Sequence, residues 1–188
     1  MTLTLTYETH SITEDNENGI ATGWLPGRLS ARGRLLAAEL GVRRRTDDLA
    51  AVFTSDLARA VETARLAFAG RDIAIHQDER LRECDYGDLN GCSVADLAAV
   101  RRQHIDTPFA GGQSYQDVVA ATASFVEECS QKWDGRHILV IAHSANRWAL
   151  QVLLAGARLA DLVDAPFQWQ EGWTYEISTG WVSPARRG

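Results

Sequence analysis

The feature that most constrains the fold is the run of residues 138–142, Ile-Leu-Val-Ile-Ala, which is apolar at every position. A short run without polar alternation is typical of a strand buried on both faces, as in a parallel sheet covered by helices. Parallel strands need long crossover connections, which are usually helices. The sequence therefore predicts a three-layer α/β/α fold with a mostly parallel sheet.

Other predicted strands alternate with predicted helices along the chain. Leu3, Leu5 and Tyr7 alternate with threonines and predict a strand that runs into His10. Further strands are expected at residues 51–54, 73–75 and 173–177, the last at a sheet edge. Helices are expected at residues 30–40, with Gly41 as the stop, and at residues 146–154. Three more are expected to begin at Ser55 as N-cap and at capping boxes that start at residues 93 and 114. Residues 14–27 are predicted to form a loop.

The chain length fits one domain. With 188 residues, 45% of them hydrophobic and 23% charged, residues 1–188 are expected to fold as a single globular domain. No strand is predicted between the helices of residues 93–130, so this stretch is a candidate for a small helical cap beside the sheet.

Charge and cysteine usage restrict the partners. The net charge of −6 disfavours a broad surface for nucleic acid or for anionic membrane. Three cysteines without a CxxC pair, a start without a basic apolar leader, and no long apolar run predict a cytoplasmic chain. The oligomeric state stays open, and a homodimer is one option.

Two histidines follow predicted strands, at the edge of the sheet where ligands bind. His10 and His143 each end a strand, and Arg59 lies in the first turn of a helix that follows another strand. These groups, together with helix N-termini, suit an anion. Each residue alone is more often structural, and a zinc site with Asp15 or Glu83 as third ligand is an alternative that spacing does not separate.

Five blocks in order resemble the histidine phosphatase (phosphoglycerate mutase-like) superfamily. Residues 9–16, Thr-His-Ser-Ile-Thr-Glu-Asp-Asn, are similar to the family's Arg-His-Gly-Glu-Thr-x-x-Asn. Residues 55–64, Ser-Asp-Leu-Ala-Arg-Ala-Val-Glu-Thr-Ala, are close to Ser-Asp-Leu-x-Arg-Ala-x-x-Thr-Ala. Residues 81–91 resemble Leu-x-Glu-x-x-x-Gly-x-x-x-Gly, and residues 23–30 and 138–146 look like the loop before the first helix and the strand that carries the second histidine.

The resemblance implies a phosphatase that needs no metal or cofactor and acts on a small phosphorylated substrate. His10 would be the nucleophile that forms a phosphohistidine. Arg59 and His143 would hold the phosphoryl oxygens, and Asn16 would add a hydrogen bond. Glu83 would protonate the leaving oxygen and then activate water.

The first block departs from the family pattern. Thr9 stands where the family has arginine, and one lost charge-assisted contact costs about 1.5–3 kcal/mol, roughly one to two decades in rate. Arg147, and less strongly Arg28, are candidates to replace that charge. The glycine after each histidine is replaced, by Ser11 and by Ser144, which changes the backbone approach to phosphate.

These departures leave the function open between three readings. A phosphomonoester hydrolase is favoured over a phosphoglycerate mutase, because Cys84 replaces the arginine usual after the acidic residue in the mutase branch. An inactive relative that binds a phosphorylated ligand is the third reading, motivated by Thr9. Trp148, Trp169 and Trp173 are candidates either for a substrate pocket or for packing in a core or an interface.

Overall fold

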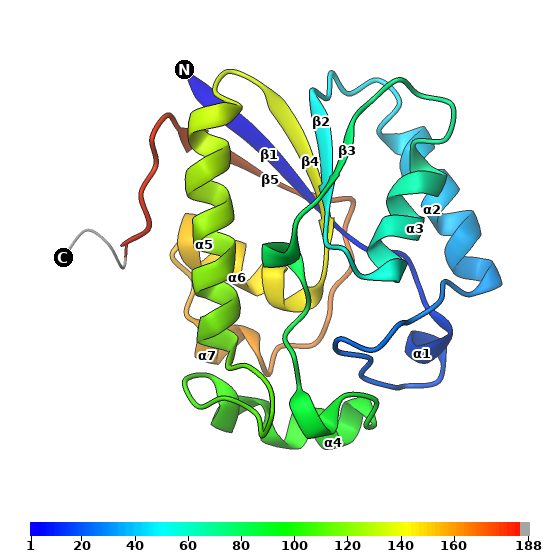
Figure 1. Cartoon of the computed structure of the whole chain (residues 1–188), viewed down its shortest axis with the longest axis vertical. Helices are drawn as coiled ribbons and strands as arrows, with labels where there is room; N and C mark the ends of the chain where they lie inside the picture. The colour runs from blue at the N-terminus through cyan, green and yellow to red at the C-terminus, as the bar shows by residue number, and fades with distance from the viewer. Residues whose placement is uncertain (185–188) are drawn as a thin grey trace.

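The computed structural model describes residues 1–184 and contains a five-stranded sheet in the order β3-β2-β4-β1-β5 (Figure 1). Strands β1 to β4 pair in parallel, and β5 pairs antiparallel with β1 at the edge. The predicted mostly parallel sheet is confirmed. The strands are β1 (Thr2–Thr9), β2 (Ala51–Thr54), β3 (Ile75–Gln77), β4 (His137–Ala142) and β5 (Trp173–Ser178).

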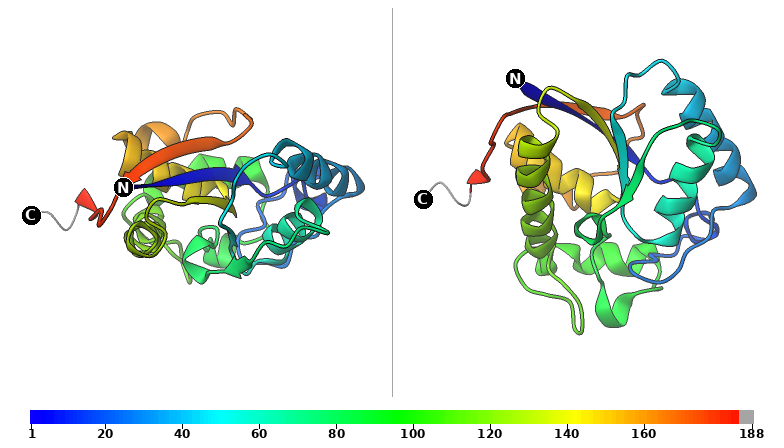
Figure 2. Two further views of the ribbon diagram at one scale, coloured as in Figure 1. Left: turned by 90° about the horizontal axis from the view of Figure 1, so that it is seen from above. Right: turned by 45° about the horizontal axis from the view of Figure 1, so that its top comes forward.

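Helices cover both faces of the sheet. Helices α2 (Ala31–Arg43) and α3 (Ala58–Ala67) lie on one side, and α5 (Tyr115–Lys132) and α6 (Ser144–Ala155) on the other (Figure 2, left). The central strand β4 is fully buried from Ile138 to Ala142, and its alternate side chains join the cores on the two faces. The apolar run therefore occupies the centre of three layers, as predicted.

Short helices complete the chain. They are α1 (Glu14–Glu17), α4 (Val94–Val100), α7 (Leu159–Leu162) and the 3-10 turns η1 (Glu79–Leu81), η2 (Gly87–Leu89) and η3 (Arg101–His104). Helix α1 lies in the stretch predicted as loop, and a capping box between Thr13 and Asn16 explains it. No helix within residues 1–184 combines the length and apolar character needed to cross a bilayer.

Two predicted helix boundaries are wrong. Gly41 does not end α2, which continues to Arg43; a Cβ at position 41 would lie 2.0 Å from the carbonyl oxygen of Ala67. The glycine therefore lets α2 pack closely on α3. Ser55 does not cap α3, because the N-cap is Leu57 and the Ser55 hydroxyl is directed to His143.

Residues 93–130 divide between two locations. Helix α4 and turn η3 lie beyond the carboxyl ends of the strands, at the bottom of Figure 1. Helix α5 instead runs along the sheet, where Phe125, Val126 and Cys129 are part of the sheet core. The predicted cap thus groups two parts that the structure places differently, and only α4 and η3 lie where they can cover the end of the sheet.

Candidate active site

His10 follows directly on β1, at the carboxyl end of the sheet. Its Nδ1 lies 2.7 Å from the carbonyl oxygen of Ser11. A carbonyl only accepts, so the ring proton sits on Nδ1 and the lone pair of Nε2 is free. Burial first, and then the charge of Arg59, lower the pKa of His10 from 6.5 to about 3. The imidazole is therefore neutral at neutral pH and held in one tautomer, as a nucleophile requires.

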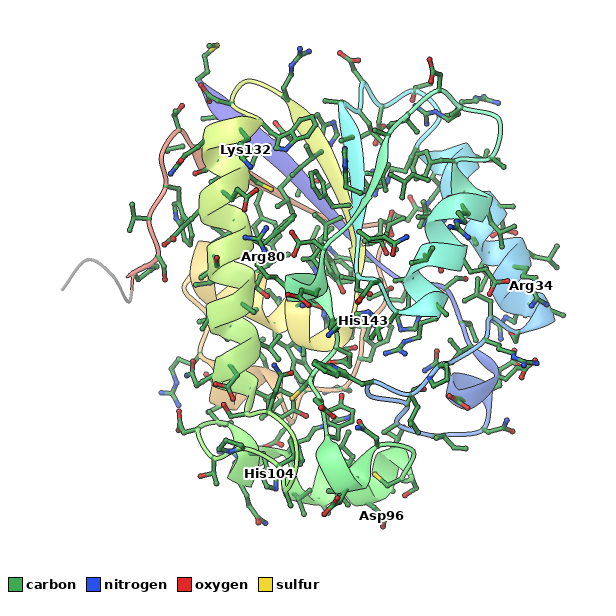
Figure 3. The ribbon with its side chains drawn as sticks, in the orientation of Figure 1. Arg34, Arg80, Asp96, His104, Lys132 and His143 are labelled. Atoms are coloured by element: carbon green, nitrogen blue, oxygen red, sulfur yellow. The ribbon has the colours of Figure 1, made fainter. Side chains whose placement is uncertain are left out.

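His143, labelled in Figure 3, is fully buried in the interior of the molecule. The two ring centroids are 5.0 Å apart. His143 Nε2 lies 2.7 Å from the hydroxyl of Ser55, which also accepts the N–H of Leu57 at 3.3 Å. The Ser55 hydroxyl can donate to Nε2, and in that tautomer the proton of the neutral ring is on Nδ1. Burial lowers the pKa of His143 well below its usual value.

The main chain around His143 is fixed by two side chains. Tyr7 donates its hydroxyl to the carbonyl oxygen of His143 at 2.5 Å, and His143 N–H donates to Asn146 Oδ1 at 3.1 Å. Asn146 also donates through Nδ2 to the carbonyl oxygen of Arg82 at 3.2 Å. One amide side chain therefore ties the start of α6 to the segment that carries Glu83.

Arg59 is 98% buried, with a relative exposure of 2%, and comes from the first turn of α3. Its Nη2 donates to the carbonyl oxygen of Gly23 at 2.7 Å and its Nη1 to that of Leu25 at 3.3 Å. Burial lowers its pKa, and nearby Glu83 opposes that shift. A guanidinium has five N–H donors, so Arg59 keeps donors for an anion after these two bonds.

Glu83 is buried in the same region. Its Oε1 accepts the N–H groups of Cys84 at 2.8 Å and Ala145 at 3.3 Å. Burial raises the pKa of this carboxyl, against the opposing effect of those hydrogen bonds and of Arg59. Trp24 Nε1 donates to the Glu83 carbonyl oxygen at 2.6 Å and fixes the backbone. A carboxyl held by one oxygen, with a raised pKa, is suited to donating a proton.

Three of these groups meet at a cavity of about 460 Å³, and His143 is not part of its wall. His10, Arg59 and Glu83 line it together with Asn16, Ser144, Arg147 and, from the α4–η3 side, Leu97 and Arg101. A second cavity of about 740 Å³ shares His10, Asn16, Ser144 and Phe167 with the first. Its wall includes Thr9, Leu36 and Trp169. His10 thus stands where the two cavities meet.

The structure places the residues of the first block, and the candidate Arg28, in different surroundings. Ser11 lines the larger cavity, but its hydroxyl donates to the carbonyl oxygen of Gly33 at 2.6 Å and its N–H to Thr63 at 3.0 Å, so it anchors the turn. Asn16 Oδ1 accepts from Thr13 N–H at 3.0 Å, which leaves its Nδ2 to donate. Arg28 is exposed and lines neither cavity, so the structure does not bring it to the site.

The other tryptophan and histidine side chains singled out in the sequence lie at the edge of the two cavities or outside them. Trp148 is buried against Tyr115, and also reaches the smaller cavity. His76, His104 and His137 are absent from the walls of both cavities within the described chain. For the zinc alternative, no group of three His, Cys, Asp or Glu side chains within residues 1–184 is arranged to hold a metal ion.

Sequence reasoning missed residues whose partners are distant along the chain. Ser55 is 88 positions from His143, and Trp24 is 59 positions from Glu83. Ser55, Trp24 and Asn146 all fall inside the five blocks. The blocks therefore mark these residues as part of the family pattern, but they do not indicate which hydrogen bonds the residues form. Arg101, from η3, carries no motif that would have indicated it.

Comparison with known proteins agrees with this geometry. The family model described as histidine phosphatase superfamily (branch 1) matches residues 9–172. A 2,3-bisphosphoglycerate-dependent phosphoglycerate mutase of Cytophaga hutchinsonii is 28% identical over 183 residues, 90% of this chain and 85% of the relative. The solved structure of Bacillus stearothermophilus YhfR has a TM-score of 0.81 and 27% identity, over 96% of this chain and 98% of that one.

A phosphatase is also among the similar structures. Mycobacterial glucosyl-3-phosphoglycerate phosphatase has a TM-score of 0.75 and 25% identity, over 88% of this chain and 87% of its own. The relatives thus include both a mutase and a phosphatase. The match over residues 9–172, and the fold around His10, show that this chain belongs to the histidine phosphatase superfamily, branch 1.

Proposed function

We propose that this chain is a metal-independent phosphomonoester hydrolase that acts through a phosphohistidine on His10. The observation that carries the proposal is the hydrogen bond from His10 Nδ1 to the Ser11 carbonyl oxygen. It keeps the Nε2 lone pair available, in a cavity shared with the cation Arg59 and the acid Glu83.

In the first step, Nε2 of His10 attacks phosphorus, an N–P bond forms and the bond from phosphorus to the ester oxygen breaks. Arg59 binds the phosphoryl oxygens as a charge-assisted donor. His143, whose buried Nδ1 has no hydrogen-bond partner among the described residues, donates from Nδ1 to the same group, and Asn16 adds a neutral donor. Glu83 gives its proton to the ester oxygen, so that a neutral alcohol leaves.

In the second step, water replaces the histidine. The ionised Glu83 takes a proton from water as its oxygen bonds to phosphorus, and the N–P bond breaks to release inorganic phosphate. Glu83 is again protonated, and His10 again carries its proton on Nδ1. The burial of Glu83 favours its protonated state, which suits the first step, while two backbone N–H donors on Oε1 support the carboxylate of the second.

A mutase is the second candidate, and one observation favours it. Arg101 joins Arg59 and Arg147 in the wall of the smaller cavity, so that site is more cationic than the sequence indicated. A mutase must retain a substrate with a second anionic group while the phosphoryl group moves. The mutase relative from Cytophaga hutchinsonii supports the same candidate.

The test is phosphate release from a panel of phosphomonoesters, including 3-phosphoglycerate, with chelator present. His10→Ala is compared with the wild type, and His76→Ala, a histidine outside both cavities, is the matched control. The proposal expects turnover that is lost in His10→Ala and kept in His76→Ala.

Other outcomes separate the alternatives. Interconversion of 2- and 3-phosphoglycerate, without net phosphate release, would support the mutase. Phosphate release that survives His10→Ala would overturn the mechanism. If the folded wild type binds inorganic phosphate but turns over no substrate of the panel, the result would support an inactive relative that binds a phosphorylated ligand.

A further inference from the structure

The side chain of Arg147 is a cation without a counter-charge, in the wall of the cavity that contains His10. We propose that Arg147 supplies the positive charge that Thr9 lacks, by binding a phosphoryl oxygen from the α6 side of that cavity. The inference rests on the proposed function, because it takes the anion to be a phosphoryl group.

Burial without an anion is the first argument. Arg147 has a relative exposure of 8%, and within the described part of the chain it forms no ion pair. Its Nε donates no hydrogen bond to any described residue. Burial lowers the pKa of Arg147, and the groups that oppose this shift are the phenols of Tyr7 and Tyr175 rather than carboxylates. A buried, unpaired cation is costly, and an anion entering the cavity would offset that cost.

The second argument is that the guanidinium is held in place. Its carbon lies 5.1 Å from the ring centroid of Phe167 and 5.1 Å from that of Trp173. Trp173 packs in turn on Tyr7, with ring centroids 5.8 Å apart. Aromatic faces stabilise a guanidinium and fix its orientation, but they leave its N–H donors unused. This gives a role to part of the segment 167–173, which carries no motif.

Position is the third argument. Arg147 lies in the first turn of α6, four residues after His143, and lines the same cavity as Arg59 and Glu83. Long side chains on a helix lean back toward its N-terminus, which here is the His143 end. The charge therefore reaches the phosphoryl site from β4–α6, whereas an arginine at position 9 would reach it from the end of β1.

The other arginines fit the role less well. Arg28 is exposed and outside both cavities. Arg101 shares the cavity and its Nε is also without a partner among the described residues, but its side chain is only half-buried, and its charge acts on Glu83. Among the three, only Arg147 is both buried and part of the cavity wall.

The experiment combines binding and rescue. Inorganic phosphate is titrated calorimetrically into the wild type, Arg147→Met, Thr9→Arg/Arg147→Met and the control Arg28→Met, and kcat/KM is measured with p-nitrophenyl phosphate. We expect Arg147→Met to weaken phosphate binding about 10- to 100-fold, as for a lost charge-assisted contact. The double variant should bind phosphate at least about tenfold more tightly than Arg147→Met. The control Arg28→Met should bind phosphate about as tightly as the wild type.

Two results would overturn the inference. One is an Arg147→Met protein that binds phosphate as the wild type does; the other is a folded double variant that recovers nothing. Thermal melting checks the fold, and Arg147→Gln, which is neutral but polar, replaces Arg147→Met if the latter does not fold. Because phosphate binding needs no turnover, an inactive wild type would count against the proposed function without deciding the role of Arg147.

Discussion

Replacing Glu83 by glutamine tests the proton-donor role with little change in structure. Oε1 of Glu83 accepts two backbone N–H groups, from Cys84 and Ala145, and the carbonyl oxygen of glutamine can accept both. The side chain keeps its size, so Glu83→Gln should fold. What it loses is the ability to donate a proton, which burial favours by raising the pKa of the carboxyl.

The size of the effect depends on the leaving group. General acid catalysis contributes about 10²- to 10⁴-fold, or roughly 3 to 5 kcal/mol of barrier. An alkyl phosphate, whose alkoxide is a poor leaving group, should lose that whole factor in kcat/KM. The p-nitrophenolate anion leaves without a proton, so kcat/KM for p-nitrophenyl phosphate should fall by less than about tenfold.

The second step, hydrolysis of the phosphoenzyme, affects kcat and kcat/KM differently. Glu83→Gln also lacks the base that activates water, so the phosphoenzyme should accumulate and kcat should fall with both substrates. Stopped-flow mixing with p-nitrophenyl phosphate should show a burst of nitrophenolate, followed by slow turnover. Glu79→Gln, at an exposed carboxyl four positions earlier, is the matched control. Equal losses of kcat/KM with both substrates, or no loss with either, would refute the assignment.

Three further predictions concern residues that shape the site and the fold. Ser55→Ala leaves His143 Nε2 without its bond at 2.7 Å, so it should lower the free energy of unfolding by about 1–3 kcal/mol and reduce kcat; an unchanged urea midpoint would contradict this. Gly41→Ala places a methyl group 2.0 Å from the Ala67 carbonyl oxygen and should cost about 1–3 kcal/mol, which thermal melting would detect, whereas an unaltered melting temperature would show that α2 does not need this close approach. His10 has a pKa lowered from 6.5 to about 3, so the unfolded chain binds its proton more readily; this contribution to stability is full above pH 6.5 and lost as pH falls toward 3, by up to about 5 kcal/mol. Urea unfolding from pH 7 to pH 4 should therefore be less pH-dependent in His10→Asn than in the wild type, and equal slopes would contradict the shift.

The central strand and its helices could be predicted because their signals are local. Residues 138–142 are apolar throughout, and β4 is buried on both faces. Gly41 and Ser55 show where local signals fail, since each serves a contact with a distant element. A glycine after a helical pattern looks like a stop, and a serine before one looks like a cap. Here the first allows α2 to approach α3, and the second binds His143.

The site was predictable in part for a similar reason. His10, Arg59 and His143 follow strand ends or begin helices, so topology alone brings them to one edge of the sheet. The side-chain bonds of Arg59 and His143 join residues far apart in sequence and leave no local pattern, whereas that of His10 goes to its neighbour Ser11. Arg28 was expected near the site and is not, because it lies exposed on the segment before α2 and lines neither cavity. The relative merits of Arg28 and Arg147 depend on burial, which sequence does not give.

The most direct test of the central claim is to trap the phosphoenzyme and locate the phosphate. The wild type is mixed with ³²P-labelled phosphomonoester, quenched in alkali, where phosphohistidine survives, and digested with trypsin. The first lysine or arginine of the chain is Arg28, so the N-terminal tryptic peptide contains His10 as its sole histidine. The account predicts an acid-labile label on that peptide, absent from His10→Ala. A label on another peptide, or turnover by His10→Ala, would contradict it.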